Sequence, residues 1–324
     1  MRHSYKFLGS NSRVSEFHHV HFGVHFSYSL GAARWVMLSA RIFMNTDMKG
    51  KVVVITGATS GIGQVAAEEL AGMGARIVQV ARDRERGEAA LSRLQSRGPG
   101  ISHSIYYADL SRIGEMKRAA AEISQAEPRI DVLINNAGAL FSSRRMTEDG
   151  LEQTFALNHM SYFVMTEGLR NRLTASGPAR VINTSSDAHK SGKVDFEDLQ
   201  SAKSYGGFKV YGTSKLCNIL FTRELARRLA GTGVTANCLH PGFVATRFGD
   251  QSGGLLSSAI GFAKFFAISP QKGAKTIVYL ASSPDVSNVT GKYFYKCRPA
   301  TPNREAQDDA KSARLWEETA KLAR

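Results

Sequence analysis

The segment YGTSK places the phenol of Tyr211 and the ammonium group of Lys215 four residues apart in a run expected to be helical. Residues at i and i+4 lie on one face of a helix, so the two groups are neighbours. A free phenol has a pKa of about 10 and is a poor base near neutrality, but a nearby ammonium group favours the phenolate. The pair is therefore a candidate for proton transfer at an alcohol or carbonyl oxygen, although the same spacing is common on solvated helices.

A glycine-rich turn, TGATSGIG, runs from Thr56 to Gly63, between a strand-like apolar run and a helical pattern. Glycines allow a ligand to approach the backbone closely, and the following helix N-terminus offers N–H groups and a positive dipole end to a pyrophosphate. The turn lacks the Gly-Lys-Ser/Thr ending of a triphosphate loop, so we expect a dinucleotide. The residues expected to bind it here are Gly57, Thr59, Ser60, Gly61, Ile62 and Gly63.

The second predicted strand ends in VARDRER, with Arg82 where an acid would bind the adenosine ribose of NAD(H). A guanidinium group pairs well with a phosphate, so we expect NADP(H), with NAD(H) less favoured. The alternative is that Arg82 is a solvated loop charge beside Asp83. Other residues expected at the cofactor follow later strands: Asp109, Leu110, Asn136, Ala137, Gly138, Pro241, Gly242, Val244 and Thr246.

Strand-like and helix-like blocks alternate from Met48 onward. The strand-like runs are 51–57, 76–82, 104–110, 130–138, 179–186 and 234–242, and helical spacing occupies 63–75, 87–98 and 113–124. This alternation predicts an α/β fold: a single Rossmann-type, doubly wound parallel sheet with helices on both faces. We expect the domain to span 48–300, followed by a helical tail at 301–324.

Composition narrows the class of protein. A chain of 324 residues with 43% apolar content fits one large domain. Its net charge of +14 is spread among interleaved acids, so nucleic acid is not an expected partner, whereas anionic cofactors or a membrane surface remain open. Three separated cysteines and no metal-ligand spacing indicate a reducing, cytoplasmic setting and no bound metal.

Residues 1–47 differ from the rest, with five of the nine histidines and only two acids. Three readings are open: an extension from an early start codon, a basic targeting segment, or a surface-binding arm.

These motifs, in this order, resemble the short-chain dehydrogenase/reductase superfamily over about residues 49–296. The segments TEDGLEQTFALNH, VINTSSDAH, SKLCNILFTREL and LHPGFVAT look like its retinol dehydrogenase-like branch. The resemblance implies a sheet of about seven strands and a tetrad. Asn158 would hold a water, Ser186 would bind the substrate oxygen, Tyr211 would be the general acid/base, and Lys215 would bind the nicotinamide ribose. Ser185 is the alternative serine.

The segment 243–270 looks like the family's substrate lid, and its apolar side chains favour a lipophilic substrate or a membrane-facing edge. We therefore expect an NADP(H)-dependent enzyme that interconverts a carbonyl and an alcohol on a retinal-, steroid-, polyketide- or aldehyde-like molecule. One alternative is double-bond reduction like that of protochlorophyllide reductases. Another is a non-catalytic nucleotide sensor on the same fold. A homo-oligomer is left open.

Overall fold

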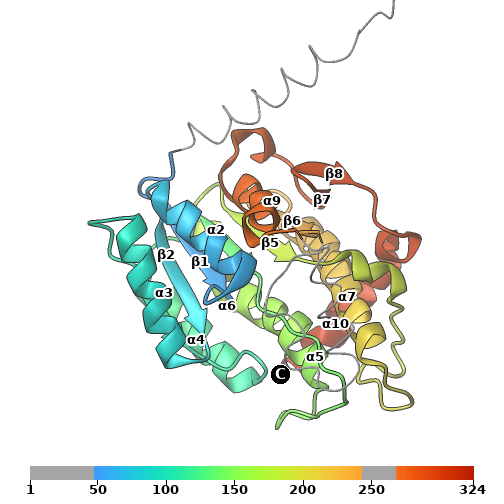
Figure 1. Ribbon diagram of the computed structural model, residues 1–324. Coiled ribbons are helices and arrows are strands. Elements are labelled where there is room, and N and C mark those ends of the chain that lie inside the picture. Colours follow the sequence, from blue (N-terminus) through green and yellow to red (C-terminus); the bar gives the residue numbers. More distant parts are fainter. Residues whose placement is uncertain (1–46, 243–267) are drawn as a thin grey trace, which may run out of the picture. The chain divides into compact units, whose positions relative to one another are not determined.

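A computed structural model of the chain describes residues 47–242 and 268–324. An eight-stranded sheet forms its centre, in the order β3-β2-β1-β4-β5-β6-β7-β8 (Figure 1). The strands are β1 (Val52–Thr56), β2 (Arg76–Ala81), β3 (Ser104–Tyr107), β4 (Val132–Asn135), β5 (Arg180–Thr184), β6 (Thr235–Leu239), β7 (Tyr293–Tyr295) and β8 (Arg298–Ala300). Neighbouring strands from β1 to β7 are parallel, and the predicted Rossmann-type sheet is confirmed.

Helices cover both faces of the sheet, because the buried strands carry apolar side chains on either side. One face packs against α2 (Gly61–Gly72), α3 (Arg84–Arg97) and α9 (Pro270–Ser282). The other packs against α4 (Ile113–Ala126), α6 (Ser161–Ala175), α7 (Gly207–Arg228) and α10 (Asp309–Leu322). The short elements α5 (Gln153–Phe155), η1 (Ala156–Met160), η2 (Asp187–Ser191), η4 (Pro284–Val286) and η5 (Arg304–Gln307) complete the described part.

The eighth strand was not predicted. It pairs antiparallel with β7 through a two-residue turn, in which Lys296 and Cys297 have φ values of 49° and 60°. Such turns normally carry Asn or Gly, because those residues adopt positive φ at least cost. Neither residue type is present here, so the sequence holds no hairpin signal.

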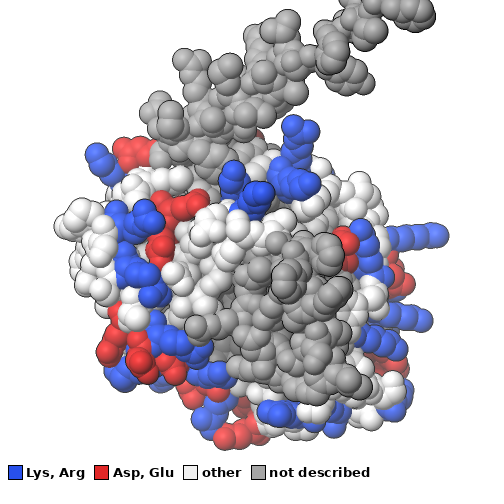
Figure 2. Space-filling model, viewed as in Figure 1, with Lys and Arg blue, Asp and Glu red and all other residues white. Residues whose placement is uncertain are grey.

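Basic and acidic side chains are interspersed over the described surface in Figure 2, as the sequence indicated. Among the described residues, no helix is long and apolar enough to cross a membrane. Residues 1–46 of the predicted extension and 243–267 of the predicted lid lie outside the described residues.

Candidate functional site

The glycine turn brings β1, α2 and the end of β4 into close contact. Gly57 has a φ of 69°, and a Cβ atom there would lie 2.8 Å from the Cα of Ala137. A Cβ atom on Gly63 would lie 2.3 Å from the carbonyl oxygen of Gly57. Side chains are therefore excluded at both positions, because the backbone of the turn packs directly against the end of β4 and the start of α2.

The N-terminus of α2 lacks the internal cap that a structural helix usually has. The side chain of its N-cap residue, Ser60, makes no capping hydrogen bond, and the first turn holds no acid. In contrast, Asp83 caps the next helix, α3, by accepting a hydrogen bond of 2.9 Å from the N–H of Arg86. The uncapped N–H groups of α2 fit the pyrophosphate of a dinucleotide.

The NNAG segment braces the glycine turn from β4. The side-chain amide of Asn136 donates to the carbonyl oxygens of Thr56 (3.3 Å) and Gly57 (3.1 Å). The hydroxyl of Thr56 accepts from the N–H groups of Asn136 and Ala137. The Asn136 side chain therefore shapes the turn, and a cofactor here would meet mainly small residues and backbone.

The two acidic residues near the expected adenosine site, Asp83 and Asp109, each accept hydrogen bonds from other residues of the chain. Asp83 is used in the α3 cap, and Oδ1 of Asp109 accepts from the N–H (3.0 Å) and hydroxyl (2.8 Å) of Ser111. Arg82 is exposed and makes no hydrogen bond or ion pair with any residue in 47–242 or 268–324. Leu110 is buried in the core, so its side chain does not face a ligand.

The structure brings the four predicted tetrad residues together at the carboxyl ends of β4 and β5. Tyr211 and Lys215 lie on the buried face of α7, and the Lys215 Nζ is 5.5 Å from the Tyr211 ring centre. The Ser186 hydroxyl lies close enough to the Tyr211 phenol to lower its pKa. A Cβ atom on Gly138 would lie 3.3 Å from the Lys215 Nζ and 3.1 Å from the Asn158 Oδ1.

The ammonium group of Lys215 hydrogen-bonds to a backbone carbonyl group. Its Nζ donates to the carbonyl oxygen of Thr184 at 3.2 Å and lies over the ring of Tyr162 at 5.6 Å. Lys215 is 3% exposed, and burial lowers its pKa to about 7. Burial raises the pKa of Tyr211, while the hydrogen bond from Ser186 lowers it. Without a ligand, burial thus outweighs the attraction expected between the ammonium and the phenolate.

Asn158 is held at three points, in the π-helical turn η1. Its Oδ1 accepts from the N–H of Ala139 (2.8 Å), and its Nδ2 donates to the Ala139 carbonyl (2.9 Å) and the Ser214 hydroxyl (3.0 Å). Single π turns interrupt α-helices mainly at functional sites, because they turn one residue out of register. Here the interruption aims Asn158 at the segment after β4.

The two candidate serines have different surroundings. Ser185 is buried, and its hydroxyl donates to the carbonyl oxygen of Lys215 at 2.7 Å. Ser186 is the residue that contacts Tyr211. This geometry favours Ser186 as the substrate-facing serine and gives Ser185 a structural role in holding α7.

Cys217 is fully buried on α7, and burial raises the pKa of its thiol to about 12, as expected for an apolar core residue. Among the described residues, no three His, Cys, Asp or Glu side chains are grouped as metal ligands.

Pro241 and Gly242 follow β6, with Gly242 at a φ of 91°. Val244 and Thr246 lie outside the described residues.

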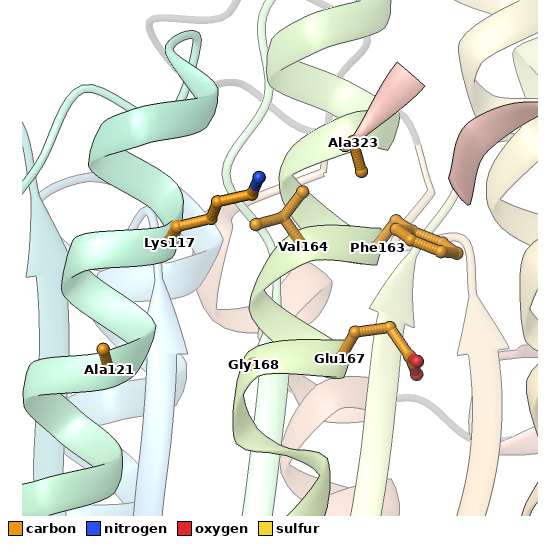
Figure 3. A pocket seen from close by; sticks show the side chains of 7 residues that line it. All are labelled: Lys117, Ala121, Phe163, Val164, Glu167, Gly168 and Ala323. Carbon is orange, nitrogen blue, oxygen red and sulfur yellow. The ribbon is translucent and has the colours of Figure 1, made fainter. Parts of the chain in front are cut away.

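A surface groove of about 310 Å³ lies away from these residues, between α4, α6 and the end of α10 (Figure 3). Its lining residues are Lys117, Ala121, Phe163, Val164, Glu167, Gly168 and Ala323. The Lys117 ammonium group is used in a 2.9 Å hydrogen bond to the carbonyl oxygen of Arg324. Within 47–242 and 268–324, none of the predicted site residues lines this groove, and we assign it no role in the reaction.

Two histidines that the sequence did not place in the site, His189 and His159, support it. His189 lies buried behind Ser186: its Nδ1 is 2.8 Å from the Ser186 carbonyl oxygen, and its Nε2 is 3.2 Å from the N–H of Asn303. His159 follows Asn158 and contacts Asn218 and Thr319. Apart from Ser186, their partners lie far away in the chain, so no local pattern indicates these contacts.

Comparisons with known proteins identify the family of the chain. Residues 51–253 match the family model for short chain dehydrogenases. The chain is 40% identical to retinol dehydrogenase 14 of Mus musculus, over 89% of this chain and 93% of that protein. The fold matches a crystal structure of an uncharacterized protein from Mycobacterium paratuberculosis with a TM-score of 0.69 and 30% identity, covering 87% of this chain and 96% of that one.

A second solved structure, titled as the RhlG/NADP active-site complex of Pseudomonas aeruginosa, matches with a TM-score of 0.61 and 27% identity. It covers 76% of this chain and 95% of that chain. The family match covers more than half of the sequence, and its motifs are those that converge in the structure. The chain therefore belongs to the short-chain dehydrogenase/reductase family of oxidoreductases, in its retinol dehydrogenase-like branch.

Proposed function

We propose that the protein is an NADP(H)-dependent oxidoreductase that interconverts a carbonyl and an alcohol on a lipophilic small molecule. The observation that carries this proposal is the contact between Ser186 and Tyr211, one helical turn from Lys215 on the buried face of α7. A proton donor, a neutral hydrogen-bond donor and a cation are thereby gathered in one place, next to Gly138, which is exposed.

Each residue of the site would have its own role in the reaction. The bound cofactor supplies or accepts the hydride. Ser186 donates a hydrogen bond to the substrate oxygen without competing for its proton, and Tyr211 gives that oxygen a proton in reduction or removes one in oxidation. Lys215 stabilises the phenolate that forms when the proton leaves, and Asn158 fixes the backbone at Ala139 beside it.

The preference for NADP(H) rests on Arg82 and Asp83. One carboxylate oxygen of Asp83 is used in the α3 cap, which directs this acid toward Arg86 and disfavours its use on the 2′-hydroxyl group of an NAD(H) ribose. Arg82 has no competing partner in the described residues and would pair with a 2′-phosphate. The similarity to a protein whose structure is titled as an NADP complex supports the same preference.

The lipophilic substrate class rests on the name of one relative, retinol dehydrogenase 14, and on the apolar residues of 243–267. A lipophilic substrate and a net charge of +14 also favour a cytoplasmic enzyme that meets its substrate at an anionic membrane surface.

A spectrophotometric screen tests the proposal. The purified protein is mixed with NADPH or NADH and a panel containing retinal, a steroid ketone, short and long aldehydes, and retinol with NADP⁺ for the reverse reaction. We expect turnover with NADPH and an apolar carbonyl compound, and weaker turnover with NADH. Binding of NADPH without turnover of any compound would contradict the proposal and favour a nucleotide sensor.

A further inference from the structure

His159 is a buried polar residue for which the proposed reaction has no direct use. It lies in η1, immediately after Asn158, and is 1% exposed. The rings of Phe155 and Phe221 lie beside it, with centres 5.1 and 6.0 Å away. A buried imidazole destabilises a fold unless both ring nitrogens find partners, so its two hydrogen bonds show what it does.

The hydrogen bonds of His159 have one consistent direction. The Asn218 Nδ2 donates to the carbonyl oxygens of Asn158 (2.9 Å) and Thr184 (3.3 Å), so its Oδ1 must accept. The His159 Nδ1, 3.3 Å from that Oδ1, therefore carries the proton. Its Nε2 accepts from the Thr319 hydroxyl at 3.0 Å. Both partners are uncharged, and burial lowers the pKa of His159 to about 4, so the ring stays neutral near pH 7.

The two carbonyl groups that Asn218 holds belong to the site. The carbonyl oxygen of Thr184 is also the acceptor for the Lys215 ammonium group. The carbonyl of Asn158 belongs to the residue whose side chain fixes Ala139. A continuous chain of hydrogen bonds thus runs from Thr319 to the residues around Tyr211.

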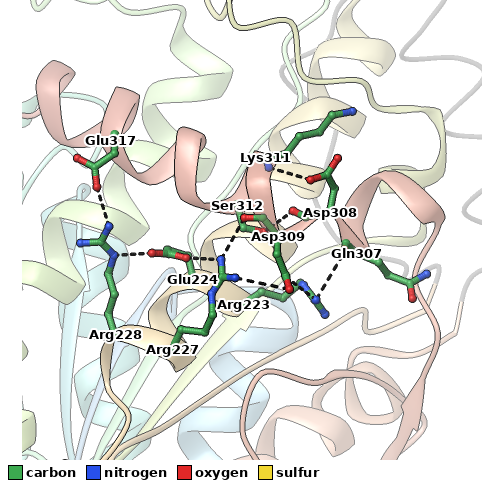
Figure 4. A network of polar contacts seen from close by, with 10 residues as sticks. All are labelled: Arg223, Glu224, Arg227, Arg228, Gln307, Asp308, Asp309, Lys311, Ser312 and Glu317. Atoms are coloured by element: carbon green, nitrogen blue, oxygen red, sulfur yellow. Dashed lines mark hydrogen bonds and ion pairs between the residues drawn. The ribbon is translucent and has the colours of Figure 1, made fainter.

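Thr319 is fixed because α10 is firmly docked on α7. Trp316 stacks on Phe221, with ring centres 5.6 Å apart and an interplanar angle of 18°. The Arg228 guanidinium lies 4.5 Å from the Trp316 ring centre and bridges Glu224 and Glu317. Figure 4 shows the wider network, in which Arg223, Arg227, Asp309, Gln307, Asp308, Lys311 and Ser312 also take part.

We propose that His159 is a positioning residue, which transmits the docking of α10 through Asn218 to the carbonyl groups that hold Lys215 and Asn158. This inference rests on the proposed function. It makes the C-terminal helix a supporting part of the active site, since Thr319 fixes the imidazole from the side opposite Asn218.

Three variants test the inference with the full-length protein: His159→Leu removes both hydrogen bonds, Thr319→Val removes one, and His159→Asn keeps a donor near the Nδ1 position. We expect His159→Leu to lower kcat by roughly tenfold, and Thr319→Val by roughly threefold, since each loses buried hydrogen bonds that align the site. KM for the substrate should stay within about twofold. His159→Asn keeps the bond to Asn218 but loses the bond to Thr319, so its kcat should resemble that of Thr319→Val.

The dependence of kcat on pH in alcohol oxidation is a second measurement. If His159 only stabilised the fold, its replacement would not change this dependence. A displaced Thr184 carbonyl stabilises the Lys215 ammonium group less well, so the base form of Tyr211 would appear at higher pH and the rising limb of kcat would move upward. Thr276→Val is the matched control, since Thr276 is a buried threonine on α9, on the opposite face of the sheet. It should leave kcat and the profile unchanged.

Wild-type kcat and an unshifted profile in both His159→Leu and Thr319→Val would overturn the inference. If His159→Leu does not fold, as judged by circular dichroism and NADPH binding, Thr319→Val and His159→Asn decide. Failure of the proposed function gives a different result, because the wild-type protein would then bind NADPH without turning over any compound.

Discussion

Replacing Lys215 by methionine should stabilise the cofactor-free protein at pH 7 while abolishing turnover. The lysine is buried, no carboxylate among the described residues pairs with it, and its pKa falls from 10.5 to about 7. The unfolded chain keeps this proton up to about pH 10.5, whereas the folded protein releases it near pH 7. Between these values the unfolded state binds more protons, so the free energy of unfolding of the wild type rises with pH.

The size of the effect follows from that pKa shift. At about 1.4 kcal/mol per pKa unit, burying Lys215 costs about 4 kcal/mol at pH 7. Methionine removes this cost but also loses the hydrogen bond to Thr184, worth about 1 kcal/mol, which leaves a net gain of about 3 kcal/mol. Near pH 9.5 the cost of burying Lys215 falls to about 1 kcal/mol, which the hydrogen bond to Thr184 offsets. The wild type and Lys215→Met should therefore be about equally stable at this pH.

Urea denaturation of the cofactor-free proteins between pH 6 and 9.5 measures this difference. Lys209→Met is the matched control, because Lys209 is exposed on the same helix and should show no such gain. If Lys215→Met is less stable than the wild type at pH 7, or differs from it by the same amount at every pH, burial of the lysine does not carry this free-energy cost.

Four further substitutions separate the parts of the site. Ser186→Ala should lower kcat by at least about a hundredfold with little change in stability. Ser185→Ala should lower stability by about 1 kcal/mol, through loss of its hydrogen bond to the Lys215 carbonyl, and should keep most of the activity. Steady-state kinetics and thermal unfolding distinguish the two variants. Arg82→Asp should reverse the preference between NADPH and NADH in kcat/KM, and an unchanged ratio would make Arg82 a surface charge. Gly63→Ala should abolish NADPH binding and destabilise the fold, since its Cβ would lie 2.3 Å from the Gly57 carbonyl oxygen; a variant that binds NADPH normally by fluorescence titration would contradict this.

Local sequence patterns account for the sheet and for the position of the site. The apolar runs became the buried parallel strands, and residues that follow β1, β4, β5 and β6 meet because parallel strands end at one edge. The spacing of Tyr211 and Lys215 on α7 is likewise a local property of a helix.

Features that depend on distant contacts were not predictable in this way. The choice between Ser185 and Ser186 depends on which hydroxyl faces Lys215 and which faces Tyr211. The contact of His159 with Thr319 joins residues 160 positions apart. The pKa directions depend on burial, which packing of the whole domain decides, and the Coulomb attraction expected from helical spacing alone proved the smaller effect.

The central claim is that Tyr211 transfers the proton to or from the substrate oxygen. Measuring turnover and NADPH affinity of Tyr211→Phe side by side, with a substrate that the wild type converts, tests it most directly. We predict that kcat falls by at least about a thousandfold, as expected for loss of the general acid/base, while the Kd for NADPH changes by less than about threefold. Turnover within about tenfold of the wild type, with NADPH still bound, would contradict the claim.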